Sequence, residues 1–374
     1  MRKHSSLPPS AAKMWIACNP SAKKNAELPD QTSPFAQEGT DAHALCEYKL
    51  LKALGRDAKD PREDLTYYDQ EMEDASDDYV SFVMEHAPAE SEVMTEQRLD
   101  FSTYAPGGYG TGDCIVLSPD GNLNIIDFKY GKGIPVSAGN DKDGINPKLG
   151  CYALGALSAF DGIYDIETVS VSIFQPRLNI AETYTISKEE LETWGREVLA
   201  PAADRASKGE GEFVAGDHCT FCKFKAQCRK RAEYQLELAK YDFAKPDSLE
   251  DDEVAAILDR VDGFISWAND IKDYALSQAI AGKEYAGYKL VEGRAVRKYT
   301  CDKAVAEAVS NAGFDPFERK VLGITAMTKL LGKEKFEELV GSYVMKPAGK
   351  PTLVPVSDKR RALNISAKED FKEE

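Results

Sequence analysis

An aspartate and a lysine that lie two residues apart in an apolar run give the chain its clearest chemical signal. Asp127 and Lys129 belong to the segment LNIIDFK, so both side chains point to the same side of a predicted strand. Charged groups at the edge of an apolar core are costly unless they are paired or used. Asp113, in the segment GDCIVL, comes one hairpin earlier and can reach the same place. Two interpretations remain open on these residues: an Asp–Lys ion pair at a strand end, or a catalytic carboxylate site.

The catalytic interpretation has a defined chemistry. Asp113 and Asp127, together with a backbone carbonyl, would form a hard-oxygen site suited to Mg²⁺ or Mn²⁺. A lysine such as Lys129 beside that ion could orient a water molecule and offset charge on a phosphate. Glu96 lies on a third predicted strand that could supply a further carboxylate. His43, in GTDAH, precedes these strands; a single histidine is more often a core or surface residue than a ligand.

Four of the eight cysteines form a second candidate site. Cys219, Cys222 and Cys228 are spaced Cys-x-x-Cys-x₅-Cys, and Cys18 lies far earlier, in the apolar patch MWIAC. A closed site for a soft metal needs four ligands, and zinc with His218 as the fourth ligand is one alternative. The other cysteines lie in apolar periodic stretches and are predicted to be small core residues; they are Cys46, Cys114, Cys151 and Cys301.

The elements that must position these residues follow from hydrophobic periodicity. Apolar positions three and four residues apart predict helices, and alternation predicts strands. We predict helices over 37–54, 146–160, 188–205, 231–238, 249–281, 302–312 and 325–344, and a helix that starts near 79 after a charged loop. We predict strands over 92–99, 112–117, 123–129 and 168–175, and a hairpin over 287–300. Residues from 346 onward are predicted to lack regular structure.

Composition and charge bound the class of protein. The chain has 374 residues with 43% hydrophobic residues, which is ordinary for a globular protein. It has no apolar run long enough to span a membrane and no apolar leader, so we expect a cytoplasmic protein without a membrane partner. The net charge of −16 argues against a protein that coats nucleic acid electrostatically.

Two short segments run against this acidic background. Residues 1–26 and 219–231 each hold five basic residues and no acid. If Cys18 joins the later cysteines, both segments share one surface that could bind phosphates. Trp15, Phe221 or Phe224 could stack on bases there, although packing around a metal site is the simpler role for these aromatic residues.

The order of these motifs resembles the RecB-like branch of the PD-(D/E)XK nucleases over about residues 5–235. The resemblance implies that His43, Asp113 and Asp127 bind the metal, that Lys129 is the catalytic lysine, and that Glu96 supports them. The family also has a Gln-x-x-x-Tyr helix. Tyr152 matches its tyrosine, but Lys148 stands in the glutamine position, where it could contact a phosphate or alter activity.

The cysteine pattern is similar to that of AddB-type and CRISPR-adaptation nucleases. In those proteins one cysteine before the nuclease motifs and a Cys-x-x-Cys-x₅-Cys group after them hold a [4Fe–4S] cluster. The resemblance therefore implies that Cys18, Cys219, Cys222 and Cys228 hold such a cluster. It also implies a set of basic residues that bind nucleic acid, namely Lys132, Lys148, Lys223, Lys225 and Arg229.

The expected fold is an α/β PD-(D/E)XK restriction-endonuclease-like core, a mixed central sheet flanked by helices, with a helical Fe–S lobe and a small α+β C-terminal region. We expect a nuclease domain over 1–240, an accessory region over 241–345 and a tail over 346–374. The layout is similar to a phage-encoded family otherwise of unknown function.

The expected activity is metal-dependent hydrolysis of DNA, as an exonuclease in phage or prophage recombination or replication. DNA ends or single strands are the expected substrates, and a single-strand annealing or binding protein is the expected partner. The alternative is a DNA-binding subunit of a recombination complex that has lost turnover.

Overall fold

The computed structural model describes residues 5–29, 34–238, 249–291, 300–317 and 321–345. The chain divides into two compact units, Met1–Ser277 and Gln278–Glu374. The division falls within helix α9 (Asp251–Ile280), so most of α9 belongs to the first unit. Among the described residues, no helix combines the length and apolar character needed to cross a membrane.

The described part of the first unit is a mixed α/β structure built on a five-stranded sheet with the order β1-β2-β3-β6-β7. The strands are β1 (Glu92–Asp100), β2 (Tyr109–Leu117), β3 (Asn122–Phe128), β6 (Thr168–Gln175) and β7 (Ile180–Ser187). Neighbouring strands are antiparallel except for β3 and β6, which are parallel. The short hairpin β4 (Gly139–Asn140) and β5 (Gly144–Ile145) and helix α5 (Pro147–Phe160) make the crossover that a parallel pair needs.

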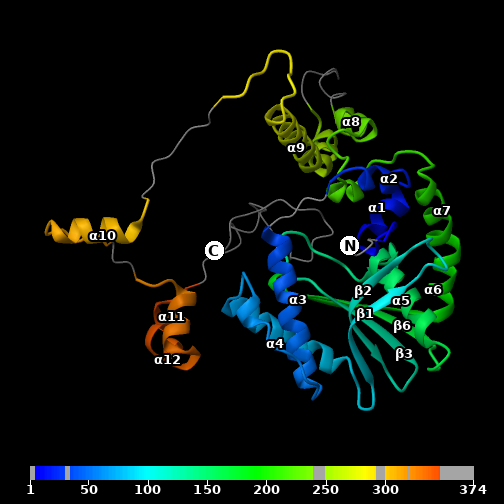
Figure 1. Cartoon of the computed structure of the whole chain (residues 1–374), viewed down its shortest axis with the longest axis horizontal. Helices are drawn as coiled ribbons and strands as arrows, with labels where there is room; N and C mark the ends of the chain where they lie inside the picture. The colour runs from blue at the N-terminus through cyan, green and yellow to red at the C-terminus, as the bar shows by residue number, and fades with distance from the viewer. Residues whose placement is uncertain (1–4, 30–33, 239–248, 292–299, 318–320, 346–374) are drawn as a thin grey trace, which may run out of the picture. The chain divides into compact units, whose positions relative to one another are not determined.

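Helices cover both faces of the sheet, and each face has its own apolar core (Figure 1). On one face, α5 packs with Leu149, Ala153 and Leu157 against sheet residues such as Ile115 and Ile125. On the other face lie α3 (Pro34–Ala53) and α4 (Gln70–Glu85). The predicted mixed sheet flanked by helices is therefore confirmed.

Helix α4 begins at Gln70, nine residues before the predicted start. Asp69 caps it by accepting a hydrogen bond from the Met72 backbone N–H. The acidic residues that suggested a loop lie on the outer face of this helix, and Lys49 and Arg62 form ion pairs with Glu73. A 3₁₀ turn over Arg62–Asp64 precedes the helix.

The N-terminal segment packs against later helices of the same unit. It comprises a 3₁₀ turn (Pro9–Ala11), α1 (Ala12–Ala17) and α2 (Ser21–Ala26). Helices α1 and α2 pack against α7 (Ala200–Lys208), and the 3₁₀ turn packs against α5. Helix α7 continues the helical run of α6 (Lys188–Trp194) and a π-helical turn (Gly195–Leu199). Trp15 is fully buried and donates a hydrogen bond to the Pro8 carbonyl, so packing, not base stacking, is its role.

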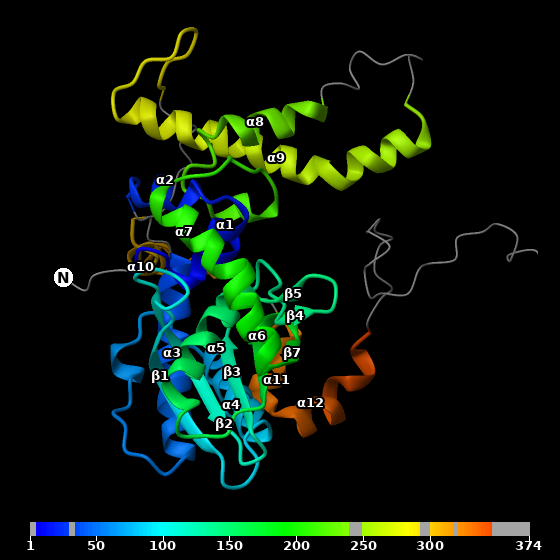
Figure 2. The same cartoon turned by 90° about the vertical axis from the view of Figure 1, so that its right-hand side faces the viewer.

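A cysteine-containing loop and two helices follow α7. The loop includes a short 3₁₀ helix (Asp217–Phe221) and leads into α8 (Arg229–Leu236). Helix α9 runs beside α8 (Figure 2). Asp270 on α9 forms ion pairs with Lys225 at 2.8 Å and with Arg231 at 2.7 Å, which ties α9 to this loop.

The second unit is helical in its described residues. It contains α10 (Asp302–Asn311), α11 (Ile324–Leu331), α12 (Lys333–Val340) and a 3₁₀ turn (Gly341–Tyr343). Residues 292–299 of the predicted hairpin, and the predicted tail from 346, lie outside the described residues. Cys301 is exposed in front of α10, so its assignment to a core was wrong, whereas Cys46, Cys114 and Cys151 are buried as predicted.

Candidate metal centre

Three carboxylates from three neighbouring strands form a row across the sheet. Thr95 pairs with Cys114 and Gln97 with Gly112, which sets Glu96 on β1 opposite Asp113 on β2. Cys114 pairs in turn with Ile126 on β3. Because these two strands are antiparallel, the adjacent residues Asp113 and Asp127 lie opposite each other. Acids directly across a sheet repel each other, so a row of three needs cations to be stable.

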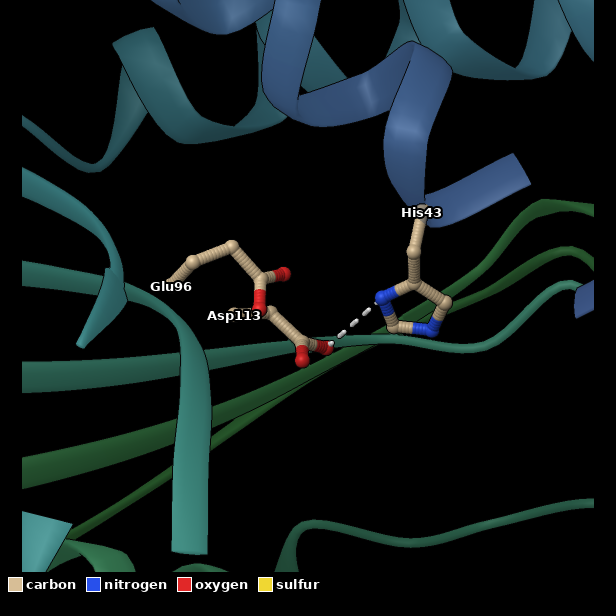
Figure 3. Close-up of side chains that lie close together, drawn as sticks. All are labelled: His43, Glu96 and Asp113. Atoms are coloured by element: carbon tan, nitrogen blue, oxygen red, sulfur yellow. Dashed lines mark ion pairs between the residues drawn. The ribbon is translucent and has the colours of Figure 1, made fainter. Parts of the chain in front are cut away.

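His43 joins two of these acids from the helical layer above the sheet (Figure 3). Its Nδ1 lies 3.5 Å from Oδ2 of Asp113. The imidazole ring packs edge-on against Phe128 with a centroid separation of 5.4 Å, which fixes its position over the strands. The ligand atoms of His43, Glu96 and Asp113 all lie within 4.8 Å of one another.

Glu96 adopts a backbone conformation that glutamate rarely takes. Its φ angle is 48°, in the left-handed region, within an otherwise extended strand. Such a conformation costs about 1–3 kcal/mol and persists where the surrounding structure imposes it. Burial of the carboxyl end, and then the negative charges of Asp113 and Glu47, raise the pKa of Glu96 to about 7, although part of this side chain reaches solvent.

Asp127 has different surroundings from the other two acids. The residue is 1% exposed, and its two oxygens form ion pairs with two lysines: Oδ1 with Lys148 at 2.5 Å, and Oδ2 with Lys129. Burial alone would raise the pKa of Asp127, but the charges of the two lysines outweigh burial and lower it. Burial lowers the pKa of Lys129 despite the neighbouring Asp127.

These donors can accept a divalent cation. His43, Glu96 and Asp113 offer one imidazole nitrogen and two carboxylates, a donor set typical of Mn²⁺ and compatible with Mg²⁺. Oδ2 of Asp113 also accepts a hydrogen bond from the Phe128 backbone N–H at 2.9 Å, which orients the carboxylate. Asp127 is not part of this group. The third possible ligand is therefore Glu96, whereas the sequence resemblance implied Asp127.

The remaining residues predicted for this site lie at its border. Tyr152 is buried one turn after Lys148 on α5, with the Lys148 ammonium 5.3 Å from the centre of its ring. Burial raises the pKa of Tyr152, so its hydroxyl stays protonated at neutral pH. Lys132 is exposed in the loop that follows β3.

The four cysteines named as cluster ligands line one apolar cavity. Cys18, at the end of α1, meets Cys219, Cys222 and Cys228 there, beside Phe224. N–H groups approach two of the sulfurs. The Asn25 side chain donates to Cys222 Sγ at 3.3 Å, and the Val214 backbone N–H donates to Cys18 Sγ at 3.5 Å.

The spacing of these sulfurs differs from that of a zinc site. Tetrahedral zinc–thiolate bonds of ~2.3 Å hold the sulfurs roughly 3.8 Å apart. Among the described residues, no three of these sulfurs, with or without His218, form a group within 4.8 Å. His218 lines the same cavity: its Nε2 lies 2.9 Å from the Val214 carbonyl oxygen, and a hydrogen bond with Cys18 raises the pKa of its imidazole.

The structure brings the two basic segments together, but several of their charges are already paired. Lys223 donates its backbone N–H to the Asn25 side chain at 2.6 Å, which joins the segments directly. Lys225 pairs with Asp270, a carboxylate that the sequence offered no reason to choose. Arg229 is exposed at the start of α8. Of the ten basic residues, Arg2 and Lys3 lie outside the described residues, and Lys24, Lys225 and Arg231 form ion pairs with acids. The described phosphate surface is therefore smaller than predicted.

The fold and the site define a mixed α/β protein with a carboxylate–histidine cluster formed by β1, β2 and α3. Residues 4–361 match a family described as "Protein of unknown function (DUF2800)", and the chain belongs to that family. It is also similar to the protein in "Crystal structure of SSO0001", with 16% identity and a TM-score of 0.24 over 51% of this chain and 97% of that chain. A likeness at that TM-score carries no functional argument.

Proposed function

We propose that this protein is a Mg²⁺- or Mn²⁺-dependent nuclease with the PD-(D/E)XK core and that it hydrolyses DNA phosphodiester bonds. The observation that carries the proposal is the meeting of His43, Glu96 and Asp113 beside the paired Asp127 and Lys129. Glu96 in this cluster has a left-handed backbone angle, and strain of that kind gathers at functional sites.

The residues of the site have separate roles in the proposed reaction. A divalent ion held by His43, Glu96 and Asp113 would polarise a phosphoryl oxygen and lower the pKa of a bound water. Lys129 faces this site with a lowered pKa, so its ammonium can orient the attacking water and give up a proton more readily than an exposed lysine. Tyr152 keeps its hydroxyl proton and can donate a hydrogen bond to a phosphate oxygen.

We propose that the four cysteines hold a [4Fe–4S] cluster. Their convergence from two distant segments into one apolar cavity, with N–H donors directed at sulfur, supports an iron–sulfur site. The test is anaerobic purification followed by iron, sulfide and zinc analysis. We expect four irons per chain and loss of iron in Cys18→Ser; zinc in place of iron would contradict the proposal.

Linear DNA ends or single strands are the proposed substrates, in phage or prophage recombination or replication in the cytoplasm, with a single-strand annealing or binding protein as partner. Exonuclease action is the form we expect. One observation favours a second candidate, a DNA-binding subunit without turnover. Both oxygens of Asp127 form ion pairs with lysines. In the nuclease family that the sequence resembles, the residue at this position binds the metal, and these ion pairs would prevent that here.

Digestion of end-labelled linear single- and double-stranded DNA separates the two candidates. Wild type should give products with Mn²⁺ and none with EDTA, and His43→Ala or Lys129→Ala should lower the rate at least about 100-fold. Asp165→Ala removes an exposed carboxylate elsewhere and should cleave like wild type. DNA binding without cleavage by wild type would favour the subunit, and the product ladder would give the polarity.

A further inference from the structure

Lys148 occupies a position where a positive charge is unfavourable. It is the second residue of α5, and its backbone N–H is capped by the Asn146 side chain at 3.0 Å. The first turn of a helix carries a partial positive charge and favours anions over lysine. The side chain is also largely buried, with 24% exposure. A cation placed against both the helix dipole and desolvation requires a compensating partner.

That partner is Asp127, which needs cations for its own reasons. The carboxylate is buried, and one of its oxygens is paired with Lys129. Lys148 takes the other oxygen at 2.5 Å, so the carboxylate has an ammonium group on each side. The same carboxylate is the next member of the acid row after Asp113. Lys148 therefore supplies a positive charge to the end of the row that His43 and Glu96 do not reach.

We propose that Lys148 is a built-in cation that keeps Asp127 out of the metal's ligand set and thereby limits both the affinity and the number of divalent ions that the site binds. The proposal rests on the proposed metal site of His43, Glu96 and Asp113. The metal site holds a single hard divalent ion. The ammonium group of Lys148 occupies the position beside Asp127 where a second divalent ion would otherwise bind.

Removal of the ammonium has two consequences that point the same way. Oδ1 of Asp127 becomes a free anionic donor at the border of the ligand cluster, and repulsion between Lys148 and an incoming cation disappears. Changes to such outer partners alter metal affinity by about 10–100-fold. We therefore expect Lys148→Gln to bind Mn²⁺ at least about tenfold more tightly than wild type, or to bind two ions in place of one.

The experiment is a Mn²⁺ titration of the full-length chain, in which the electron paramagnetic resonance signal of free Mn²⁺ reports the number of sites and the affinity. Wild type, Lys148→Gln, Lys148→Arg and the double variant Lys148→Gln/Asp127→Asn are compared. The arginine keeps the charge and should bind like wild type. The double variant should lose the gain, because the freed donor is gone. Lys142→Gln, which removes the charge of an exposed lysine between β4 and β5, should have no effect.

A second substitution guards against misfolding, because glutamine is shorter than lysine. Lys148→Met keeps the packing of the stem along Tyr152 without the charge and should show the same gain. The proposal is overturned if both neutral variants bind Mn²⁺ within threefold of wild type with the same stoichiometry. It is also overturned if the gain survives in the double variant, which would mean a general charge effect.

His43→Ala separates this proposal from the function on which it rests. If wild type binds no Mn²⁺, or if His43→Ala binds it as well as wild type does, the metal site itself is wrong. If His43→Ala loses affinity while Lys148→Gln matches wild type, the metal site stands and only the role of Lys148 falls.

Discussion

Glu96 combines a strained backbone with a carboxyl group that faces other acids. Its φ of 48° turns the side chain toward Asp113 and His43. Its pKa of about 7 means that, in the protein without metal, about half of these carboxyl groups carry a proton at neutral pH. A cation that displaces this proton relieves the repulsion, so the residue links metal binding to pH.

The raised pKa of Glu96 predicts how folding stability depends on pH. In the unfolded chain the group titrates near its ordinary value of 4.5, and in the folded chain near 7. The stability it contributes is complete below about pH 4.5 and is lost as pH rises through 7. Glu96→Gln escapes this loss. Its melting temperature relative to wild type should therefore increase between pH 5 and pH 8, and saturating Mn²⁺ should reverse the order at pH 8.

Thermal melts of both proteins at the two pH values test this prediction. Asp165→Asn, which also removes one carboxylate but from an exposed loop, should keep a constant difference from wild type. An equal gap between Glu96→Gln and wild type at pH 5 and pH 8 would show that repulsion at this carboxyl does not affect stability.

At the scale of elements, the close approach of α5 to β1 holds Lys148 and Tyr152 over the acid row. Gly155 makes this approach possible: a Cβ there would lie 3.0 Å from Leu99 Cβ and 3.1 Å from the Asp100 nitrogen. Because the second contact is with backbone, the strand and helix must separate to accept a side chain. The glycine therefore determines where the residues one and two turns earlier on α5 are placed.

Gly155→Ala should be destabilising. Overpacking of about 1–3 kcal/mol outweighs the gain of up to ~1 kcal/mol from higher helix propensity. Urea unfolding should show a lower midpoint at an unchanged slope. Gly162→Ala, at a position where an added Cβ meets nothing within 4 Å, is the matched control and should unfold like wild type. A Gly155→Ala midpoint at or above that of wild type would show that α5 has room to move.

The sequence predicted best those elements whose apolar residues follow a single clear pattern. The apolar run of β6 was predicted over the residues that form it, because a buried strand needs few polar residues. Strand β7 was missed: it lies at the sheet edge and alternates half-buried residues such as Ile180 and Tyr184 with exposed ones. Helix α4 was half missed because its acids masked the apolar face that includes Met72 and Tyr79.

The candidate site was predictable in its residue types but not in its pairings. Sequence order pointed to His43, Asp113 and Asp127, yet which acids share a ligand cluster depends on strand register and on side chains from other elements. Asp127 leaves the cluster because Lys148, 21 residues later, pairs with it. No local pattern contains that information.

At the scale of the whole molecule, Asp270 secures α9 against the cysteine loop. Arg231 is 5% exposed and depends on Asp270 for its charge partner. Loss of one member of a buried ion pair costs about 3–5 kcal/mol because the other charge is left unpaired. Lys225 loses the same partner. The cost should be concentrated in this lobe, because the sheet and its two cores do not depend on α9.

Asp270→Asn should therefore speed amide hydrogen exchange in α8 and the cysteine loop while leaving β2, β3 and β6 as protected as in wild type. Asp273→Asn, an exposed neighbour on the same helix, is the control and should exchange like wild type. Equal exchange in both variants would show that α9 is not required to order the lobe.

The contact between the N-terminal segment and the cysteine loop has a consequence for biosynthesis. Asn25 and Cys222 meet although 197 residues separate them. At a synthesis rate of about 5–20 residues per second, the segment waits roughly 10–40 s on the ribosome before its partner exists. During that interval Cys18 lacks the three cysteines with which it lines a cavity in the finished fold. Any metal that Cys18 shares with these cysteines therefore enters only late in translation or after release.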